Sequence, residues 1–438
     1  MMDFKALFEK AKEKGLEALQ IRYTQSHSVE LEVFKGELDT HEIADSVKLV
    51  IEGVYNGRKA GLVTEKPDLS RVDFWVDALI ENAKVVESDD PVVIYEGDAS
   101  YEEVSGVFNP DLKALGIDAK KAMVFDLENK VGKADPRIDI SSAFYSETER
   151  MVHLENSKGL SLDKHVNHAV LGAHIVAKEN GDSRSAFEYI QTNNPEELDY
   201  ENLIDAVVER GVSMLGAKPV ESGKYDVLIE NRASAALLGA FLPMFKAEAV
   251  QKGHSKLKGK LGDAIAKPIL NLIDDPFMAK SPKSGGFDDE GVATKKKSIV
   301  SEGVLNTYFH NLKTAKKDGV ESTGNGFSSG IAPTNLYIEP GEKSIEALQK
   351  EMKDGLLITG FQGLHSGTNS ISGDFSLQAS GYVIKDGEIS RPVSLITLSS
   401  NYLELLQSIE AIGRDLRFNF AFIGSPTLRI DSMSISGT

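Results

Sequence analysis

Cysteine is absent from this 438-residue sequence. Without thiols the chain forms no disulfide, no thiolate zinc site and no cysteine-ligated iron–sulfur cluster, and it has no cysteine nucleophile. Long apolar segments are also missing, because the longest, residues 235–245, falls well short of the roughly 20 residues that a membrane span needs. The charged start of the chain, residues 1–19, lacks the apolar core of a signal peptide. We therefore expect a soluble, cytoplasmic protein that does not enter a membrane.

Positive charge is in short supply as well. The sequence has 49 Lys and Arg against 67 Asp and Glu, which gives a net charge of −18. Such a surface repels a phosphate backbone, so we expect no nucleic-acid partner. One basic cluster, formed by Lys252, Lys256, Lys258 and Lys260, is interrupted by glycine and has no interleaved aromatic residue. This pattern is typical of a solvated loop rather than of a nucleic-acid groove.

The length of the chain predicts two domains of about 200 residues each. In the N-terminal half, four short runs alternate apolar and polar side chains, and turn residues occur at Lys35-Gly36 and Asn56-Gly57. The runs are residues 19–26, 28–35, 37–44 and 46–54. This part of the sequence predicts an antiparallel meander.

Helices and further strands complete the predicted N-terminal domain. Helical patterns cover residues 3–17, 70–86, 118–132 and 199–215, and strands return between 137 and 191. The segment Lys218–Gly223 is the best domain boundary, which divides the chain into domains 1–218 and 219–438. Neither half alternates strand and helix regularly. We therefore predict the α+β class, with antiparallel and mixed sheets and packed helices.

The C-terminal half begins with a strand of the buried type at 225–230, followed by a helix that Asn231 is expected to cap. Pro243 should end or kink that helix, because proline lacks the amide donor and clashes with the preceding turn. Two further helices are expected, at 343–353 and 401–410. Short strands alternate there with three glycine-rich loops, residues 283–291, 322–331 and 363–374.

Hydrolytic chemistry needs an activated nucleophile or a metal-polarised water. The nucleophile pattern G-x-S-x-G occurs once, around Ser328, but the sequence after it resembles a strand and not the helix that a nucleophile elbow requires. His41-Glu42 is the only His-Glu pair, and no second imidazole follows at the spacing of a zinc motif. Among the cluster His165, His168 and His174, only the last two share a face of the predicted strand.

Paired carboxylates are the remaining candidates for chemistry. They occur at Asp274-Asp275 and at Asp288-Asp289-Glu290. Such pairs can hold a hard cation or share a proton, although acidic residues in glycine-rich loops are most often solvated turn residues. His254, His310 and His365 fall in turns or loops and would converge only through the fold.

Several short motifs in the C-terminal half occur in a fixed order. They are Phe287–Thr294 (FDDEGVAT) with Ser301–Leu305, Ser322–Gly326, Asn335 with Tyr337, Asp354–Ile358, Gly373–Ser376, Gly387–Ile389, and Gly424–Leu428. Together they resemble the signature of the TldD/TldE (PmbA) protease family. The N-terminal half resembles the family more loosely, in its strand pattern and in Gly57-Arg58 and Gly61. The resemblance therefore covers nearly the whole chain.

The metal motif of that family is degenerate here. In the TldD branch, a helix carries His-Glu-x-x-x-His after a Leu-Leu pair, and a loop near the C-terminus adds a cysteine ligand. The corresponding ligand positions hold Gly239 and Met244, and the position of the general base holds Ala240. The late loop, between Asp415 and Gly424, is short and has no cysteine. This pattern resembles the TldE (PmbA) subunit.

The resemblance implies a non-catalytic subunit of a cytosolic metalloprotease that acts on small or unfolded peptides. It implies no catalytic residue, metal or cofactor in this chain, with zinc only in a TldD-type partner, and a homodimer when no partner is present. Two alternatives stay open. One is a self-sufficient peptidase that uses Asp288, Asp289, Glu290 or Ser328 with a loop histidine. The other is a binding protein that modulates DNA gyrase.

We expect an extended peptide to pair with a strand edge in a cleft lined by the three glycine-rich loops, because glycine lets another backbone approach closely. The alternative is that these loops are only flexible connections. The candidate peptide-binding residues are Asp288, Asp289, Glu290, Gly324, Asn325, Gly326, His365 and Asn369.

Overall fold

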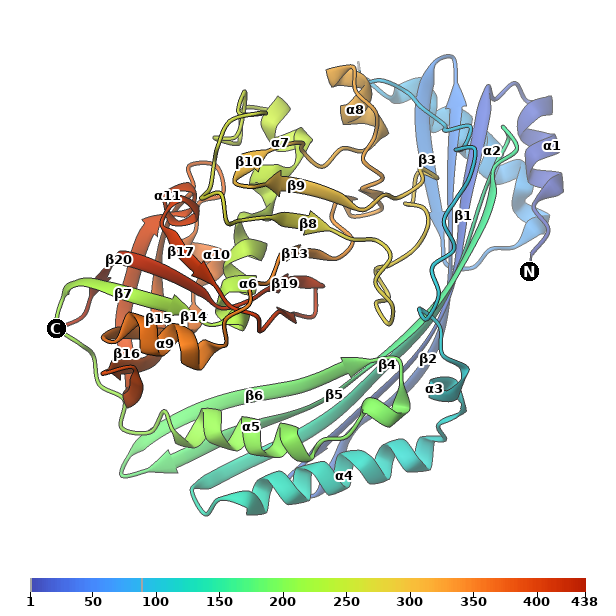
Figure 1. The fold of residues 1–438 in the computed structure, drawn as a ribbon. Coiled ribbons are helices and arrows are strands. Elements are labelled where there is room, and N and C mark those ends of the chain that lie inside the picture. Colours follow the sequence, from blue (N-terminus) through green and yellow to red (C-terminus); the bar gives the residue numbers. More distant parts are fainter. Residues whose placement is uncertain (1, 88–89) are drawn as a thin grey trace.

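The computed structural model describes residues 2–87 and 90–438. Its N-terminal part is one antiparallel six-stranded sheet in the order β3-β2-β1-β4-β5-β6 (Figure 1). The strands are β1 (Ala18–Phe34), β2 (Glu37–Tyr55), β3 (Arg58–Thr64), β4 (Ile138–Asn156), β5 (Ser161–Glu179) and β6 (Asp182–Thr192). The strands β1, β2, β4 and β5 have 17 to 19 residues, about three times the usual strand length in a globular protein.

The turn residues of the meander were predicted correctly, but the strand lengths were not. Lys35 and Gly36, like Asn56 and Gly57, have positive φ angles, as a two-residue hairpin turn requires. The separate runs 19–26 and 28–35 form the single strand β1, and 37–44 and 46–54 form β2. The ladder continues through the expected breaks because His27 pairs with Asp45 across the two strands, Nδ1 to Oδ1 at 2.8 Å.

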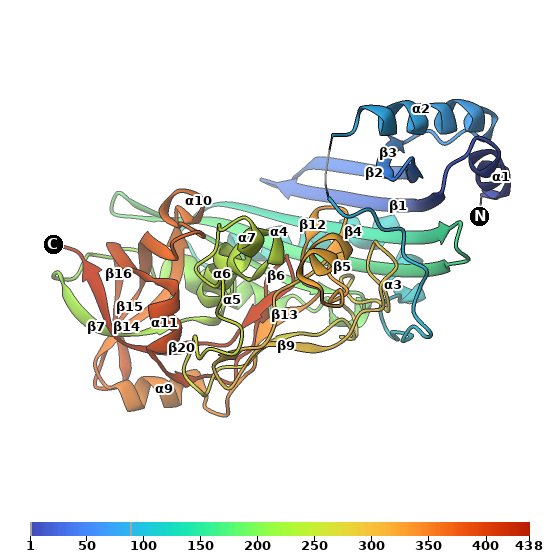
Figure 2. The same ribbon diagram turned by 90° about the horizontal axis from the view of Figure 1, so that it is seen from above.

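Helices cover one face of this sheet at both of its ends. At one end, α1 (Lys5–Glu13) and α2 (Val72–Val85) pack with Trp75 against Leu19 and Ile21 of β1. At the other end, α4 (Ile117–Ala134) and α5 (Glu201–Val212) pack against Leu31 and its neighbours (Figures 1 and 2). All these β1 residues have odd numbers and so share one face. The even-numbered face, with Arg22 and Thr24, therefore points toward the C-terminal half.

The C-terminal half contains two larger sheets. The first has the order β16-β15-β14-β7-β20-β17, and an additional pairing of β16 with β20 closes it on itself. Its strands are β7 (Gly223–Ile229), β14 (Gly355–Gln362), β15 (Asp374–Lys385), β16 (Glu388–Asn401), β17 (Ile409–Ile412) and β20 (Leu428–Ser436). Only the pairing of β7 with β14 is parallel, so this sheet is mixed.

The second sheet runs β10-β9-β8-β13-β19-β18, and a separate hairpin pairs β11 with β12. The strands are β8 (Leu272–Asp274), β9 (Lys297–Ser301), β10 (Val304–Leu305), β11 (Gly326–Phe327), β12 (Gly330–Ile331), β13 (Leu336–Ile338), β18 (Arg417–Phe418) and β19 (Ile423–Ser425). The remaining helices are α3 (Pro110–Ala114), α7 (Ala247–Gln251), α8 (Leu312–Asp318), α9 (Ile345–Met352), α10 (Leu364–Gly367) and α11 (Tyr402–Gln407).

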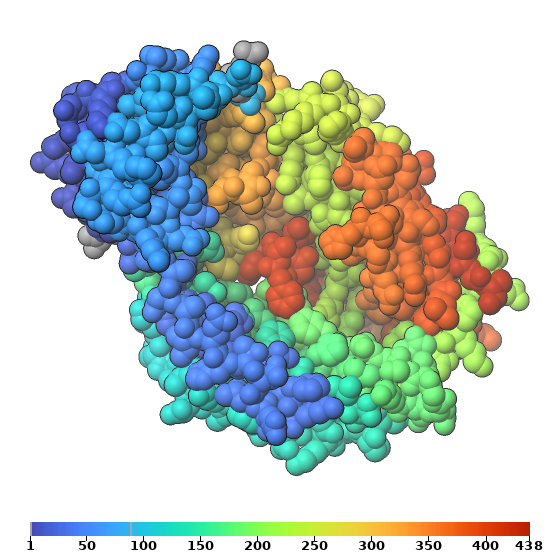
Figure 3. Space-filling model, turned by 180° about the vertical axis from the view of Figure 1, so that it is seen from behind, coloured from blue at the N-terminus to red at the C-terminus, as the bar shows by residue number. Residues whose placement is uncertain are grey.

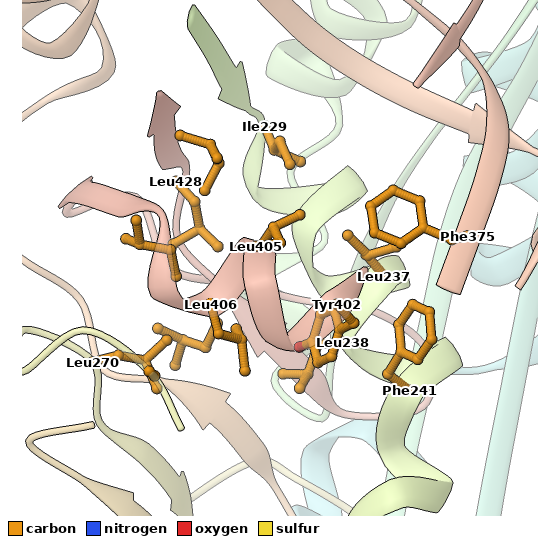
Figure 4. Packing of buried hydrophobic residues seen from close by; sticks show 14 of the residues in the cluster. Ile229, Leu237, Leu238, Phe241, Leu270, Phe375, Tyr402, Leu405, Leu406 and Leu428 are labelled. Carbon is orange, nitrogen blue, oxygen red and sulfur yellow. The ribbon is translucent and has the colours of Figure 1, made fainter. Parts of the chain in front are cut away.

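Helix α6 (Asn231–Phe241) lies at the centre of the C-terminal core, where Phe241 stacks on Tyr402 (Figure 4). As predicted, Pro243 ends it, and residues 242–245 form a 3-10 turn. The expected cap was wrong, because the Asn231 side chain donates instead to the backbone oxygen of Asp415, at 2.9 Å. Asn231 thereby ties the start of α6 to the segment before β18.

The α+β class, with antiparallel and mixed sheets and packed helices, is confirmed. All strands of the first sheet precede residue 193, and all strands of the other sheets follow residue 222. The division into domains 1–218 and 219–438 stays a prediction consistent with this arrangement. None of the helices in the described residues is long and apolar enough to cross a membrane.

Candidate functional site

The degenerate motif helix α6 lies beside the late loop that connects β18 and β19. The hydroxyl groups of Ser234 in α6 and Ser425 in β19 hydrogen-bond at 2.7 Å. At Gly239, a Cβ atom would lie 3.3 Å from the Cδ1 atom of Ile423. The structure thus brings together the two segments that, by the resemblance, carry the metal ligands in the TldD branch.

Aromatic side chains fill the late loop. Phe420 stacks on Tyr189 of β6, with ring centroids 3.9 Å apart, and Phe422 lies edge-on to His168 of β5. Arg417 forms an ion pair with the buried Glu188. The loop is therefore anchored to β5 and β6, and His168 and Tyr189 lie on the concave face of the long sheet. Figure 3 shows this face hollowed between the N-terminal and C-terminal halves, with residues from the end of the chain, in red, inside the hollow.

The residues at the motif positions do not fit a zinc ion. Gly239 and Ala240 have no donor atom, and the Met244 side chain is fully buried in the apolar core after α6 has ended. A thioether is in any case a soft ligand poorly suited to zinc. Within residues 2–87 and 90–438 no group of three or more His, Asp or Glu side chains could hold a metal ion.

The three β5 histidines serve separate packing roles. His165 stacks on Phe108 and contacts the Glu149 carboxylate at 2.9 Å. Burial lowers the pKa of His168 to about 4, so its imidazole is neutral at physiological pH. His174 shares the face of His168, but six residues of extended chain separate the two by about 20 Å. These side chains therefore do not converge on one ion.

Asp288 joins the first two glycine-rich loops. Its buried carboxylate accepts backbone N–H groups from Gly326 at 2.8 Å and from Glu290 and Val292 at 3.0 Å each. Burial raises the pKa of Asp288 to about 8, the Glu290 charge adds to this, and the three N–H donors oppose it. Asp288 is therefore a structural link between residues 283–291 and 322–331.

The neighbouring carboxylates are also held by the chain itself. Asp289 pairs with Arg22 of β1 and accepts the backbone N–H of Ser328 at 2.8 Å. Glu290 accepts the N–H of Leu312 at the start of α8, at 2.7 Å, and burial raises the pKa of its carboxyl. Asp288, Asp289 and Glu290 thus bind backbone and arginine donors and do not form an open pair poised for acid–base chemistry.

Ser328 lies in the two-residue turn of the hairpin β11–β12. No helix follows this hairpin, so Ser328 does not occupy a nucleophile elbow. In the part of the chain that the structure describes, no histidine hydrogen-bonds to the Ser328 hydroxyl. This geometry gives the G-x-S-x-G pattern the role of a tight turn.

The glycines of the second loop make room for the chain's own atoms. Gly324, with a φ of 68°, lies against Ala293, whose carbonyl oxygen would be 2.9 Å from an added Cβ. At Gly326 the added Cβ would meet the Glu290 carboxylate at 2.3 Å. Asn325 is buried, and its side-chain amide donates to Asp274 and to the Ala332 carbonyl. At these positions the chain's own atoms already occupy the space in which we expected a peptide backbone to lie.

The third loop is placed elsewhere. His365 is exposed on α10, and the Asn369 side chain accepts the N–H groups of Ile371 and Ser372 within its own turn. Among the described residues, no hydrogen bond or ion pair joins residues 363–374 to the other two loops. The structure therefore brings six of the eight candidate residues together and leaves His365 and Asn369 apart.

A cavity of about 210 Å³ lies between the concave face of the long sheet and the first two loops. Four basic side chains line it, and three of them come from the consecutive strands β1, β4 and β5 of the sheet. They are Arg22 on β1, Arg150 on β4, Lys164 on β5 and Lys283 in the first loop. Burial, together with the charges of Arg150 and Lys283, lowers the pKa of Lys164 to about 8.

The sequence interpretation missed these four residues. The only local signal was the alternation of polar and apolar residues along each strand, which gives a face but not what covers that face. Thr24 pairs with Val152 and Val152 with Lys164, so the cavity wall is built across three strands. That arrangement depends on strand register and on long-range packing.

Comparison with known proteins places the chain among metallopeptidases. Residues 110–215 match the model of the PmbA/TldA metallopeptidase central domain, and residues 222–437 match that of the C-terminal domain. A metalloprotease of Archaeoglobus fulgidus is 30% identical over 75% of this chain and 79% of its own length. The metalloprotease PmbA homolog of Haemophilus influenzae is 26% identical over 92% of this chain and 88% of its own.

A solved structure agrees over the whole length. The crystal structure of a candidate modulator of a DNA gyrase from Thermotoga maritima superimposes with a TM-score of 0.92 and 34% identity, covering 98% of each chain. The family-model matches together cover well over half of the sequence, and the fold agrees from end to end. The chain therefore belongs to the PmbA/TldD family of metalloproteases.

Proposed function

We propose that this chain is a non-catalytic subunit of a cytosolic metalloprotease, paired with a TldD-type subunit that carries the zinc ion. One observation carries the proposal. The helix and loop that would hold the metal lie side by side, but they present Gly239, Ala240 and aromatic side chains where ligands are needed. Without a metal-polarised water or an activated nucleophile, a chain cannot cleave a peptide bond at a useful rate.

The proposed role of the chain is to shape the space in which small or unfolded peptides are held. The hollow on the concave face of the long sheet supports this, because it is bordered by the hairpin β11–β12 and by the loop of residues 283–291. Extended peptides bind to such surfaces mainly through their backbone. A substrate would then be recognised by being unfolded rather than by one fixed sequence.

The sequence leaves two other functions open. A self-sufficient peptidase is disfavoured because Asp288, Asp289 and Glu290 are engaged by backbone and arginine donors, and Ser328 lacks a base. Modulation of DNA gyrase is what the name of the Thermotoga maritima neighbour suggests for that protein. A net charge of −18 speaks against direct DNA binding by this chain.

The test is reconstitution with a TldD-type partner. We expect cleavage of an unfolded peptide by the mixture and none by this chain alone, even with added zinc. A partner whose His-Glu-x-x-x-His motif is replaced by alanine serves as the control and should abolish cleavage by the mixture. If the TldD-type partner alone is fully active, and adding this chain changes neither its rate, its substrate range nor its stability, the subunit role is excluded. We also propose that the chain forms a homodimer when it is alone.

A further inference from the structure

The cavity between the long sheet and the first two glycine-rich loops is lined mainly by positive charge, although the protein as a whole is acidic. Four cations line it, and Asp289 is the one carboxylate among its lining residues, on a chain whose net charge is −18. Asp289 is already paired with Arg22. In the described residues, the side chains of Arg150, Lys164 and Lys283 take part in no ion pair and no hydrogen bond.

Lys164 is the most constrained of these unpaired cations. It projects from β5 toward the first loop, where an added Cβ at Gly285 would lie 2.7 Å from the Lys164 ammonium nitrogen. Glycine at position 285 therefore leaves the space that the ammonium group occupies. Arg150 and Lys283 keep much of their side chains in water, so the cavity opens past them toward solvent. An anion entering there would meet three donors that no protein group satisfies.

Apart from the cations, the wall combines apolar side chains with the polar Thr24, Ser328 and Ser329. Phe287, Phe327, Pro282 and Pro333 lie beside the cations, so an apolar side chain can follow the charged group into the cavity. Pockets for drug-sized ligands span about 300–1,000 Å³, and this one, at about 210 Å³, is smaller. The space suits the end of a chain rather than a whole peptide segment.

We propose that this cavity binds the carboxylate of a peptide, in particular the free C-terminal carboxylate behind an apolar last residue. This inference rests on the proposed function, because it names the part of the peptide that the subunit holds. Lys164 and Arg150 donate to the carboxylate oxygens, and Arg22 stays with Asp289 at the side of the cavity. Bound in this way, one end of an unfolded chain is fixed regardless of its internal sequence.

The test measures binding to the full-length chain alone, by calorimetry, so that it does not depend on cleavage or on a partner. Three versions of one peptide with an apolar last residue are compared: a free C-terminus, an amidated C-terminus, and an amidated C-terminus with one internal glutamate. We expect the free C-terminus to bind about tenfold or more tightly than the first amidated form, because charge-assisted hydrogen bonds are the strong ones. Equal binding of these two forms would overturn the proposal, and tight binding of the third form would assign the site to acidic side chains instead.

Substitutions locate the binding in the cavity. Lys164→Met keeps the length of the side chain and should remove the preference for the free C-terminus. Lys178→Met, at an exposed lysine of the same strand, is the matched control and should retain it. Arg150→Gln, at an exposed position, should weaken binding several-fold. A preference that survives both Lys164→Met and Arg150→Gln would contradict the assignment, whatever the reconstituted pair does to peptides.

Discussion

At the scale of single residues, the Asp288 carboxylate decides how the first two glycine-rich loops sit. It accepts hydrogen bonds from three backbone N–H groups that would otherwise be buried without a partner. Removing an acceptor of this kind leaves buried donors unsatisfied, which costs far more than a surface contact contributes. These hydrogen bonds give the family motif that contains Asp288 a role in folding.

Asp288→Asn should destabilise the protein by about 2–3 kcal/mol, because the amide presents N–H groups where acceptors are needed. The loss should also depend on pH. The folded-state pKa of about 8 lies above the ordinary value of 3.8, so the stability that Asp288 contributes is complete below pH 4 and is lost as the pH rises through about 8.

Melting temperatures of wild type and Asp288→Asn at pH 5, 7 and 9 check this. The difference between the two proteins should shrink as the pH rises. A difference that is the same at all three pH values would show that Asp288 does not titrate in this range.

Lys164 gives a second prediction at this scale. Its pKa in the empty cavity is about 8, lowered by burial and by Arg150 and Lys283, while Asp289 raises it. Only the protonated ammonium attracts a carboxylate, so peptide affinity should be highest below pH 8 and fall as the pH rises above it. Affinities at pH 6.5 and 9.5 measure the effect, and Lys164→Met should flatten the profile. An unchanged affinity at pH 9.5 would remove Lys164 from the site.

The sequence predicted some of these residues and could not predict others. Asp288, Asp289 and Glu290 stand out because they are adjacent and acidic. Arg22, Arg150 and Lys164 do not stand out, because they come from three strands whose pairing brings them together only in the folded sheet. No local pattern shows which loop will cover that face.

At the scale of elements, the helix α6 carries the positions that correspond to the metal motif of the TldD branch and forms part of the C-terminal core. Pro243 ends the helix, as its missing amide donor predicts, and the 3-10 turn that follows buries Met244 completely. The late loop approaches from the other side with Ile423 against Gly239. A Cβ atom at position 239 would already lie 3.3 Å from the Cδ1 atom of Ile423, so a histidine there requires Ile423 to shift.

Rebuilding the motif by Gly239→His, Ala240→Glu and Met244→His should therefore fail to create a zinc site. A histidine at position 244 places a polar ring in an apolar core, so we expect a loss of several kcal/mol in stability. The double variant Gly239→His and Ala240→Glu, at partly buried positions, should lose less stability and still hold no zinc. Elemental analysis of both purified variants is the measurement, and one zinc ion per chain in either would contradict this reading.

The second loop provides another prediction for elements. Gly326→Ala should displace the Glu290 carboxylate, release the N–H of Leu312 and loosen the start of α8. We expect a loss of about 1–3 kcal/mol, typical of overpacking at a buried site. Gly116→Ala is the matched control, since nothing lies within 4 Å of its added Cβ. If the two variants have equal free energies of unfolding in denaturant, the Glu290 side chain moves aside without a loss of stability.

Elements were predictable where a local rule applies. The positive φ angles at Gly36, Asn56 and Gly57 and the end of α6 at Pro243 follow from residue type. The unbroken length of β1 and β2 does not, because His27 and Asp45 look like breaks in isolation and become a cross-strand pair only when the strands align. The separate position of the loop 363–374 likewise depends on packing around α10 and α6.

At the scale of the whole molecule, the long sheet and the C-terminal half enclose a hollow with a positively charged cavity. Among residues 2–87 and 90–438, no group of three or more His, Asp or Glu side chains could hold a metal ion. The helices α1, α2, α4 and α5 pack on the convex face of the long sheet. The concave face is therefore available to the C-terminal loops and to a ligand. In the proposed function, the chain binds and orients a peptide in this hollow, and a TldD-type partner supplies the chemistry of cleavage.

The most direct measurement is peptidase activity and zinc content of the purified chain, alone and after mixing with a TldD-type partner. The account predicts no zinc and no cleavage for the chain alone, and zinc-dependent cleavage by the mixture that weakens when Lys164→Met replaces the wild-type chain. One tightly bound zinc ion per chain, or cleavage of an unfolded peptide by the chain in the absence of any partner, would contradict it.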